Sequence, residues 1–303
     1  MIIGVDHGYS MMKTANFAFP TGITRYEHEP YSLRDTLQVN GAYYVCGSGR
    51  QSLLREKTGN DSYQLLTLCA LAKEIEQRTG GTTADVILAA GLPLTRFGLG
   101  KQAFSAYLTD LFRKTKSFGF EDKQFTVNVK DVVLYPQGYA AVMRMIQELR
   151  AEPSVIVCDI GSWTVDVMRL DIDIPNAEYC RSIELGMIRC ITEISEQVRR
   201  NAGLSVTDSQ IENILFGRRC TVSGEISRIA IDYGKAYAEK MMGMLLENGF
   251  DCKAVPIIFL GGGATFIEKV IQRTAFCDAR FITDIHANAK GYEYIARQAF
   301  PDE

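Results

Sequence analysis

Runs of apolar residues that end in an Asp-x-Gly turn occur twice along the chain, about half its length apart. Residues 2–5 read Ile-Ile-Gly-Val and lead into Asp6, His7 and Gly8. Residues 155–158 read Val-Ile-Val-Cys and lead into Asp159, Ile160 and Gly161. Short apolar runs bounded by turn residues are typical of buried strands, and a second apolar run follows each turn. Each turn is therefore predicted to join two buried strands, and the repetition indicates two related halves.

The remaining pattern alternates between strand and helix. Apolar positions spaced three and four residues apart predict helices, and short apolar runs predict strands. Asn40-Gly41, between two alternating runs, predicts a hairpin over 36–45 with a type I′ turn. Helices are expected over 61–78, 101–114, 138–149, 186–201, 224–247, 266–272 and 287–299, and further strands over 11–19, 85–92, 124–129, 132–135 and 255–260. This mixture predicts an α/β fold with mixed sheets, divided near Glu152-Pro153, where the first pattern restarts.

Composition and charge exclude several classes of protein. The chain has 303 residues, 47% of them apolar, which is enough for two domains with their own cores. A net charge of -3 and a pI of about 5.8 argue against direct nucleic-acid binding. The 8 cysteines form no C-x-x-C pair and the 3 histidines have no metal spacing, so reduced thiols are expected. Without an apolar run of membrane-spanning length or a secretory signal at the N-terminus, we expect a cytoplasmic protein with no membrane partner.

The two Asp-x-Gly turns carry residue types that suit a phosphate and a metal ion. Glycine lets backbone N–H groups approach a phosphate closely, and a carboxylate at the strand end can hold hydrated Mg²⁺. The first turn is followed by Lys13, and the second by Ser162, Thr164 and Asp166. Taken alone, the first turn is equally well explained as an ordinary β-turn. The second is more specific, because a carboxylate inside an apolar strand is costly unless it is paired or binds a metal.

Two further motifs lie at strand ends. Gly261, Gly262 and Gly263 follow the predicted strand 255–260, where close approach of a flat or anionic group is a natural reason for three glycines. Pro136-Gln137-Gly138 opens a helix after a strand, and a glutamine there can orient a water molecule. By itself the second motif is better explained as an ordinary helix entrance.

The order Asp-x-Gly, Pro-Gln-Gly, Asp-x-Gly-x-x-Thr, Gly-Gly-Gly resembles the actin, sugar-kinase and heat-shock-chaperone ATPase superfamily over the whole chain. Within it, the chain resembles the bacterial actin-like ATPases of plasmid segregation, the ParM-like family. The form of the motif from Asp159 to Asp166, the spacing from Asp6 to Lys13 and a length that matches the bare two-domain core all favour this family. The resemblance implies duplicated ribonuclease-H-like domains with a nucleotide cleft between them. Domain I would comprise 1–152, with the helix 286–303 packing back on it, and domain II 153–285.

The resemblance also implies a role for each motif. Asp6 and Asp159 would hold Mg²⁺, mostly through water, and Gly261, Gly262 and Gly263 would receive the adenine and ribose. The catalytic residues would be Asp159 and Gln137, with Gln137 positioning the attacking water alone or together with Asp166. The nucleotide, ATP or GTP, would be bound by Asp6, Gly8, Tyr9, Ser10, Lys13, Gly161, Ser162 and Thr164. Its phosphates would meet Lys13 and the backbone of residues 8–10 and 161–162. Two positions depart from relatives: Tyr9 stands where actins place a serine, and Gln137 stands where some segregation ATPases carry glutamate.

These roles together predict a nucleoside triphosphatase that polymerises. Head-to-tail filaments of the chain would segregate plasmid DNA through a DNA-binding adaptor protein on a centromere-like site, without direct contact with DNA. The segments 31–44 and 203–221 look like insertions, and the resemblance places such inserts at subunit contacts. Two alternatives remain at this stage: a small-molecule kinase of the same fold and a non-polymerising regulatory ATPase.

Overall fold

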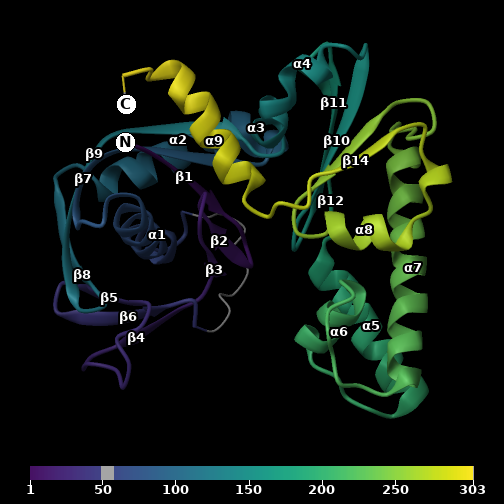
Figure 1. Ribbon diagram of the computed structural model, residues 1–303, viewed down its shortest axis with the longest axis horizontal. Coiled ribbons are helices and arrows are strands. Elements are labelled where there is room, and N and C mark those ends of the chain that lie inside the picture. Colours follow the sequence, from purple (N-terminus) through teal and green to yellow (C-terminus); the bar gives the residue numbers. More distant parts are fainter. Residues whose placement is uncertain (49–57, 303) are drawn as a thin grey trace. The chain divides into compact units, whose positions relative to one another are not determined.

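The computed structural model describes residues 1–48 and 58–302, and these residues form two compact units (Figure 1). Unit 1 comprises Met1–Arg144 and His286–Glu303, and unit 2 comprises Met145–Ile285. Each unit has its own sheet and its own helices. The α/β fold expected from the alternating pattern is therefore confirmed.

In the part of unit 1 that the structure describes, nine strands form one sheet in the order β3-β2-β1-β7-β9-β8-β5-β6-β4. The strands are β1 (Ile2–His7), β2 (Met11–Lys13), β3 (Ala18–Pro20), β4 (Ile23–Tyr26), β5 (Thr36–Val39), β6 (Ala42–Cys46), β7 (Thr83–Leu92), β8 (Lys116–Phe120) and β9 (Lys123–Pro136). The helices are α1 (Ser62–Thr79), α2 (Leu94–Leu111), α3 (Tyr139–Val142) and α9 (Ala287–Ala299). β1 runs parallel to β7 and antiparallel to β2, so the first turn joins a central strand to its neighbour.

Unit 2 is smaller, and its described strands form a sheet in the order β12-β11-β10-β13-β14. The strands are β10 (Ser154–Ile160), β11 (Val165–Asp171), β12 (Ile174–Ile183), β13 (Ile257–Leu260) and β14 (Ala279–Phe281). The helices are α4 (Ile146–Leu149), α5 (Met187–Ala202), α6 (Asp208–Leu215), α7 (Gly224–Glu247) and α8 (Ala264–Val270). β10 runs antiparallel to β11 and parallel to β13, which repeats the surroundings of β1 in unit 1. The two related halves predicted from the repeated turn are thus present in the topology.

Alternate residues of the central strands of unit 1 pack against different layers. Ile3 and Val5 of β1 belong to a core with α1 and α2, whereas Ile2 packs with α9 through Tyr292 and Ala296. Successive side chains of a strand point to opposite faces of the sheet, so a continuous apolar run requires cover on both sides. This explains why the run before Asp6 does not alternate with polar residues.

Helix α9 lies so close to β1 that only glycine fits between them. A Cβ atom on Gly4 would come within 2.1 Å of the Ala289 carbonyl oxygen. The Gly4 N–H donates to Glu293 Oε1 at 3.0 Å, and Arg78 donates to Glu293 and to the Ile2 carbonyl. A buried charge is tolerated when it is paired and hydrogen-bonded in this way. Residues after 286 therefore complete the first strand's surroundings.

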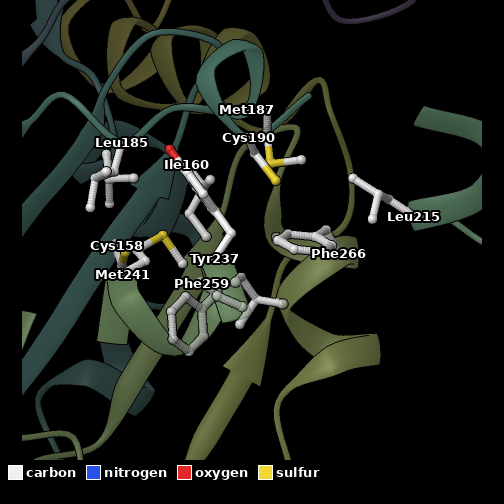
Figure 2. Packing of buried hydrophobic residues seen from close by; sticks show 14 of the residues in the cluster. Cys158, Ile160, Leu185, Met187, Cys190, Leu215, Tyr237, Met241, Phe259 and Phe266 are labelled. Carbon is white, nitrogen blue, oxygen red and sulfur yellow. The ribbon is translucent and has the colours of Figure 1, made fainter. Parts of the chain in front are cut away.

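The core of unit 2 gathers side chains from β10 and from α5 to α8 (Figure 2). Cys158 and Ile160 of β10 pack with Phe259 of β13 and with Tyr237 of α7. All four side chains are at most 5% exposed. The strand that leads into the second turn is therefore fixed on its helix-covered face.

Several predicted elements have different bounds in the structure. The strand expected over 11–19 is two short strands, β2 and β3, joined by a turn in which the Thr14 N–H donates to the Phe17 carbonyl. The strands expected over 124–129 and 132–135 are one strand, β9, with a register irregularity where its partner β7 passes from Val86 to Ile87. The helix expected over 138–149 is broken into α3, a 3-10 turn and α4. The helix α2 begins directly after Pro93, well before the expected residue 101, because Gly98 and Gly100 do not interrupt it.

Other elements agree with the sequence pattern. The hairpin of β5 and β6 turns through Asn40 and Gly41, whose φ values of 52° and 78° are those of a type I′ turn. Helices α7 and α9 begin and end as expected, while α6 lies inside the segment 203–221 that looked like an insertion. Across the described residues, every helix is too short or too polar to span a bilayer.

Candidate functional site

The first turn places Asp6 at the buried end of β1, beside two donors. Asp6 is 3% exposed, although a carboxylate is costly to bury alone. Gln137, directly after β9, donates from Nε2 to Asp6 Oδ1 at 2.7 Å, and Lys13 Nζ lies 3.5 Å from Oδ2. Lys13 is opposite Asp6 in the β1–β2 register. Thus the structure brings Gln137 to Asp6, 131 positions away in the sequence, beside Lys13.

The carbonyl groups of the first turn (residues 8–10) are held by one threonine and one tyrosine. Thr21 Oγ1 donates to the Gly8 carbonyl at 2.8 Å, and the Thr21 N–H donates to the Ser10 carbonyl at 2.8 Å. The Tyr63 hydroxyl also reaches the Gly8 carbonyl, at 3.4 Å. In a trans peptide the N–H points opposite to the preceding C=O, so the Tyr9 N–H is directed away from Thr21. Gly8 is required here, because a Cβ atom would come within 2.5 Å of the Met11 carbonyl oxygen.

A buried asparagine fixes the start of the helix after Gln137. Asn288 Oδ1, at the beginning of α9, accepts a hydrogen bond from the Gly138 N–H at 2.9 Å. Gly138 has a φ of 74°, which favours glycine, and the Gln137 N–H donates to the Leu92 carbonyl. The backbone on both sides of Gln137 is therefore fixed, and its side chain is directed to Asp6.

The second turn (residues 161–164) places two carboxylates opposite each other on neighbouring strands. Asp159 of β10 is paired with Asp166 of β11 in the antiparallel register. The Thr164 hydroxyl donates to Asp166 Oδ2 at 2.9 Å, and the Gly161 N–H donates to the Thr164 carbonyl at 2.9 Å. Asp159, Gly161, Ser162, Thr164 and Asp166 are thus grouped as the sequence predicts.

Three successive carbonyl groups of the second turn are held by the start of α5. The Gly186 N–H donates to the Trp163 carbonyl at 3.0 Å. The Met187 and Ile188 N–H groups donate to the carbonyls of Gly161 and Ser162 at 3.1 Å and 2.9 Å. The first N–H groups of a helix have no partner within the helix, so the turn satisfies them. The peptide planes then direct the N–H groups of Ser162 and Trp163 away from α5.

Gly186 allows α5 to approach the second turn closely. A Cβ atom at this position would lie 2.3 Å from the Trp163 carbonyl carbon and 2.5 Å from that of Ser162. From α7, the buried Tyr237 hydroxyl donates to the Gly186 carbonyl at 3.4 Å. Burial raises the pKa of the Tyr237 hydroxyl well above its ordinary value, so it remains protonated and able to donate. Gly186 and Tyr237 were not among the predicted site residues. The position of Gly186 at the start of the predicted helix 186–201 was a signal for the first, whereas the sequence carries none for Tyr237, whose contact spans 51 positions.

The three glycines after β13 differ in their surroundings. Cβ atoms on Gly261 and Gly263 would come within 2.3 Å of Asp159 Oδ1 and 2.2 Å of Ile160 Cγ2. These two glycines are therefore explained by close packing against the end of β10, and Gly261 also has a φ of 84°. A Cβ atom on Gly262 would have nothing within 4 Å, so this position faces open space.

The candidate residues form two groups, one in each unit. Asp6, Gly8, Tyr9, Ser10, Lys13 and Gln137 lie in unit 1, while the second turn and the three glycines lie in unit 2. Within the described ranges 1–48 and 58–302, no cluster of three or more metal-ligating side chains occurs.

Comparison with known proteins gives one match for each half of the chain. Residues 4–139 match the family model of the N-terminal domain of actin-like proteins. Residues 157–273 match the model of the C-terminal domain of an archaeal MreB-like actin homologue. No curated protein sequence matches the chain. Each half of the chain is therefore similar to a domain of actin-like proteins.

The fold is similar to that of solved actin homologues over nearly the whole chain. The archaeal actin homologue Ta0583, solved in complex with ADP, aligns with a TM-score of 0.75 at 20% identity, covering 98% of this chain and 99% of that one. Actin-like protein Alp7A gives 0.78 at 16% identity, covering 99% and 97%. Bacillus thuringiensis ParM, solved with ATP, gives 0.69 at 16% identity, covering 99% of both chains. The ParM-like resemblance predicted from the motifs is confirmed in the fold.

Proposed function

We propose that this actin-like protein is a Mg²⁺-dependent nucleoside triphosphatase that binds ATP, or GTP, through both turns at once. The observation that carries the proposal is the common arrangement of the turns. In each, the carbonyl groups are held by hydrogen bonds on one side, which directs N–H groups to the other. Arrays of N–H groups with this orientation are suited to phosphate oxygens. ADP and ATP in the related structures support the same ligand.

The donors around Asp6 and Asp159 fit a hydrated Mg²⁺ ion. Both oxygens of Asp6 already have a donor, Gln137 or Lys13, so this carboxylate suits an ion bound through water. Bound Mg²⁺ would bridge phosphate oxygens and neutralise part of their charge. Lys13 adds a positive charge beside the phosphates, and Gly262 offers open backbone to the adenine and ribose.

Gln137 is proposed to position the attacking water. Because its Nε2 donates to Asp6, its Oε1 remains as an acceptor for a proton of the water. Asp166, held by the Thr164 hydroxyl, is a second acceptor in the other unit. Positioning and charge stabilisation account for most of the catalysis in phosphoryl transfer, so no covalent intermediate is required.

Binding and hydrolysis are proposed to control polymerisation of the chain. A filament structure of the related Alp12 protein supports assembly as the output of this fold. Contacts between copies would be head to tail, because a single isologous contact closes a dimer, whereas a head-to-tail contact can propagate into an open filament. The filaments would move plasmid DNA through a DNA-bound adaptor, and the net charge of -3 is consistent with an ATPase that does not itself bind DNA.

The test combines binding, turnover and assembly. Asp159→Ala should abolish turnover and weaken Mg-ATP binding in calorimetry, while wild type releases phosphate without any co-substrate and sediments only with nucleotide. Unchanged binding by the variant would overturn the site. Phosphate release that requires a small-molecule acceptor would favour a kinase, and turnover without sedimentation would favour a regulatory ATPase. Loss from dividing cells of a plasmid that carries the Asp159→Ala gene would support the segregation role.

A further inference from the structure

The turn between β11 and β12 (residues 171–174, the β11–β12 turn) has a backbone that its sequence does not favour. Ile172 and Asp173 have φ values of 47° and 68°, and Asp171 pairs with Ile174 across the turn. Such a turn favours Asn-Gly, and a positive φ is a genuine outlier for a β-branched residue. The hairpin at Asn40 and Gly41 follows that rule in the same protein. An isoleucine at residue 172 therefore strains the fold, and folding alone does not explain it.

The side chains on either side of Asp173 are exposed and apolar. Ile172 is 62% exposed and Ile174 is 68% exposed. Single exposed apolar residues are common, but here two lie on one turn, and one of them has a strained backbone. The two-residue turn thus carries an exposed apolar side chain at Ile172.

Polar contacts hold this turn in place. The Asp171 carboxylate accepts from Asn176, Ser154 and Arg169, and these hydrogen bonds lower the pKa of Asp171 to about 2. Asp173 accepts from Arg150 at 2.7 Å, and the Ile172 N–H donates to the Pro153 carbonyl at 3.2 Å. A turn that is ordered before binding loses less entropy when it binds. The backbone that carries the isoleucines is therefore held in place.

The β11–β12 turn lies at the far end of its strands from the second turn. In the register of β10 and β11, Ile160 pairs with Val165 beside the second turn, and Ser154 pairs with Asp171 at the opposite end. A strand of 7 residues separates the two, or roughly 20 Å at the usual rise. A substitution in the β11–β12 turn can therefore leave the nucleotide-binding groups unchanged.

We propose that the β11–β12 turn is an assembly contact that packs Ile172 and Ile174 against a second copy of this chain. This inference rests on the proposed function and assigns a surface to it. The acidic side chains of the turn are paired with Arg150 and Arg169, so the contact is apolar and does not suit nucleic acid or lipid headgroups. Two side chains cover far less than the ~800 Å² per partner of a stable pair. Such a weak contact suits a polymer, in which each copy is held at several places.

The test uses Ile172→Asn, because asparagine tolerates a positive φ. We expect opposite effects on folding and assembly. The Tm should rise by about 2 °C, since strain is relieved, while the critical concentration for nucleotide-dependent sedimentation should rise at least tenfold. Nucleotide affinity in calorimetry should remain that of wild type. Ile174→Thr, which keeps a β-branched residue in the strand, should weaken assembly in the same direction.

Leu246→Asn is the matched control, because Leu246 is 58% exposed in the same unit but lies on a helix. It should sediment like wild type. Ile172→Asn filaments with the wild-type critical concentration would overturn the inference and leave the proposed function intact. An equal rise of the critical concentration in Leu246→Asn would also overturn it, since the loss of assembly would then follow from changing any exposed apolar residue. Wild type that never sediments with nucleotide would overturn the proposed function, and the contact with a second copy with it.

Discussion

The two Asp-x-Gly turns have similar sequences but are held in place by different means. In the first turn, most contacts come from side chains. Thr21 and Tyr63 donate to the Gly8 carbonyl, and Gln137 and Lys13 contact Asp6. In the second turn, the backbone of Gly186 and the next two residues holds three carbonyls directly. The same orientation of N–H groups is thus reached by hydroxyl and amide groups in one unit and by a helix start in the other. We therefore expect single substitutions around the first turn to lower stability and nucleotide affinity moderately, and a substitution at the start of α5 to lower both strongly.

The largest effect is expected from Gly186→Ala. The added methyl group would meet backbone atoms of Ser162 and Trp163, which cannot rotate away. We expect the free energy of unfolding to fall by about 3 kcal/mol, and nucleotide affinity to fall by about 100-fold as the second turn is displaced. Chemical denaturation and calorimetry measure the two effects. Gly243→Ala, on α7 with nothing near its new methyl group, is the control, and equal behaviour of the two variants would contradict the backbone-held turn.

Gln137→Ala tests whether the side chains of the first turn do more than hold it. Loss of the amide should slow phosphate release by about 100-fold, because the attacking water is no longer positioned. Nucleotide affinity should stay within about threefold, since the amide carries no charge for the phosphates. Single-turnover kinetics and calorimetry separate the two quantities. Turnover at the wild-type rate would rule out the proposed role, and filaments of the variant should outlast those of wild type.

A smaller effect is expected from Thr21→Val, which preserves shape and removes one hydroxyl. The Gly8 carbonyl loses its 2.8 Å donor but the Thr21 N–H still reaches Ser10. Unfolding free energy should fall by about 1 kcal/mol, with a severalfold loss of nucleotide affinity. Thr24→Val, at a partly exposed position of β4, is a comparable change away from the turn. If Thr21→Val lowered the unfolding free energy and the nucleotide affinity as much as Gly186→Ala, the two turns would be equally sensitive to substitution.

The smallest effects are expected from Tyr63→Phe and Tyr237→Phe. Each change removes a hydroxyl that donates a long hydrogen bond of 3.4 Å, to the Gly8 carbonyl from Tyr63 and to the Gly186 carbonyl from Tyr237. Each of these carbonyls also accepts from another donor. Each should cost less than about 0.5 kcal/mol in urea denaturation. A cost above about 2 kcal/mol for Tyr237→Phe alone would mean that the second turn also depends on a side chain.

Local sequence signals account for much of the fold. The Asn40-Gly41 turn, the long helix α7 and the buried strands that lead to Asp6 and Asp159 each have a strong signal within a few residues. The strands β4, β8, β12 and β14 were not predicted because they are short or lie at a sheet edge, and β12 carries Pro175 and two charged residues, Glu178 and Arg181. Their pairing depends on neighbours that are distant in the sequence.

The residue types of the candidate site can be predicted from the sequence, but the contacts that hold them in place cannot. Aspartate and glycine at strand ends are visible in the sequence, whereas the contact of Gln137 with Asp6 joins residues 131 positions apart. Gly261 and Gly263 look like ligand-facing residues in the sequence, yet they are needed where the chain packs on itself. Only the packed structure separates them from Gly262, which faces open space.

The position of α9 in the chain bears on how the protein is made. Near the N-terminus, the Gly4 N–H donates to Glu293 of α9, and the Ile2 carbonyl accepts from Arg78, which also donates to Glu293. In the sequence, α9 follows the whole of unit 2. A ribosome adds roughly 5–20 residues per second, so the first strand waits on the order of 10–30 s for α9 while residues 145–285 are synthesised. Unit 1 is incomplete during that time, and α9 also carries Asn288, which holds the backbone beside Gln137. The backbone beside Gln137 therefore takes its final arrangement only after the last segment of unit 1 has been added.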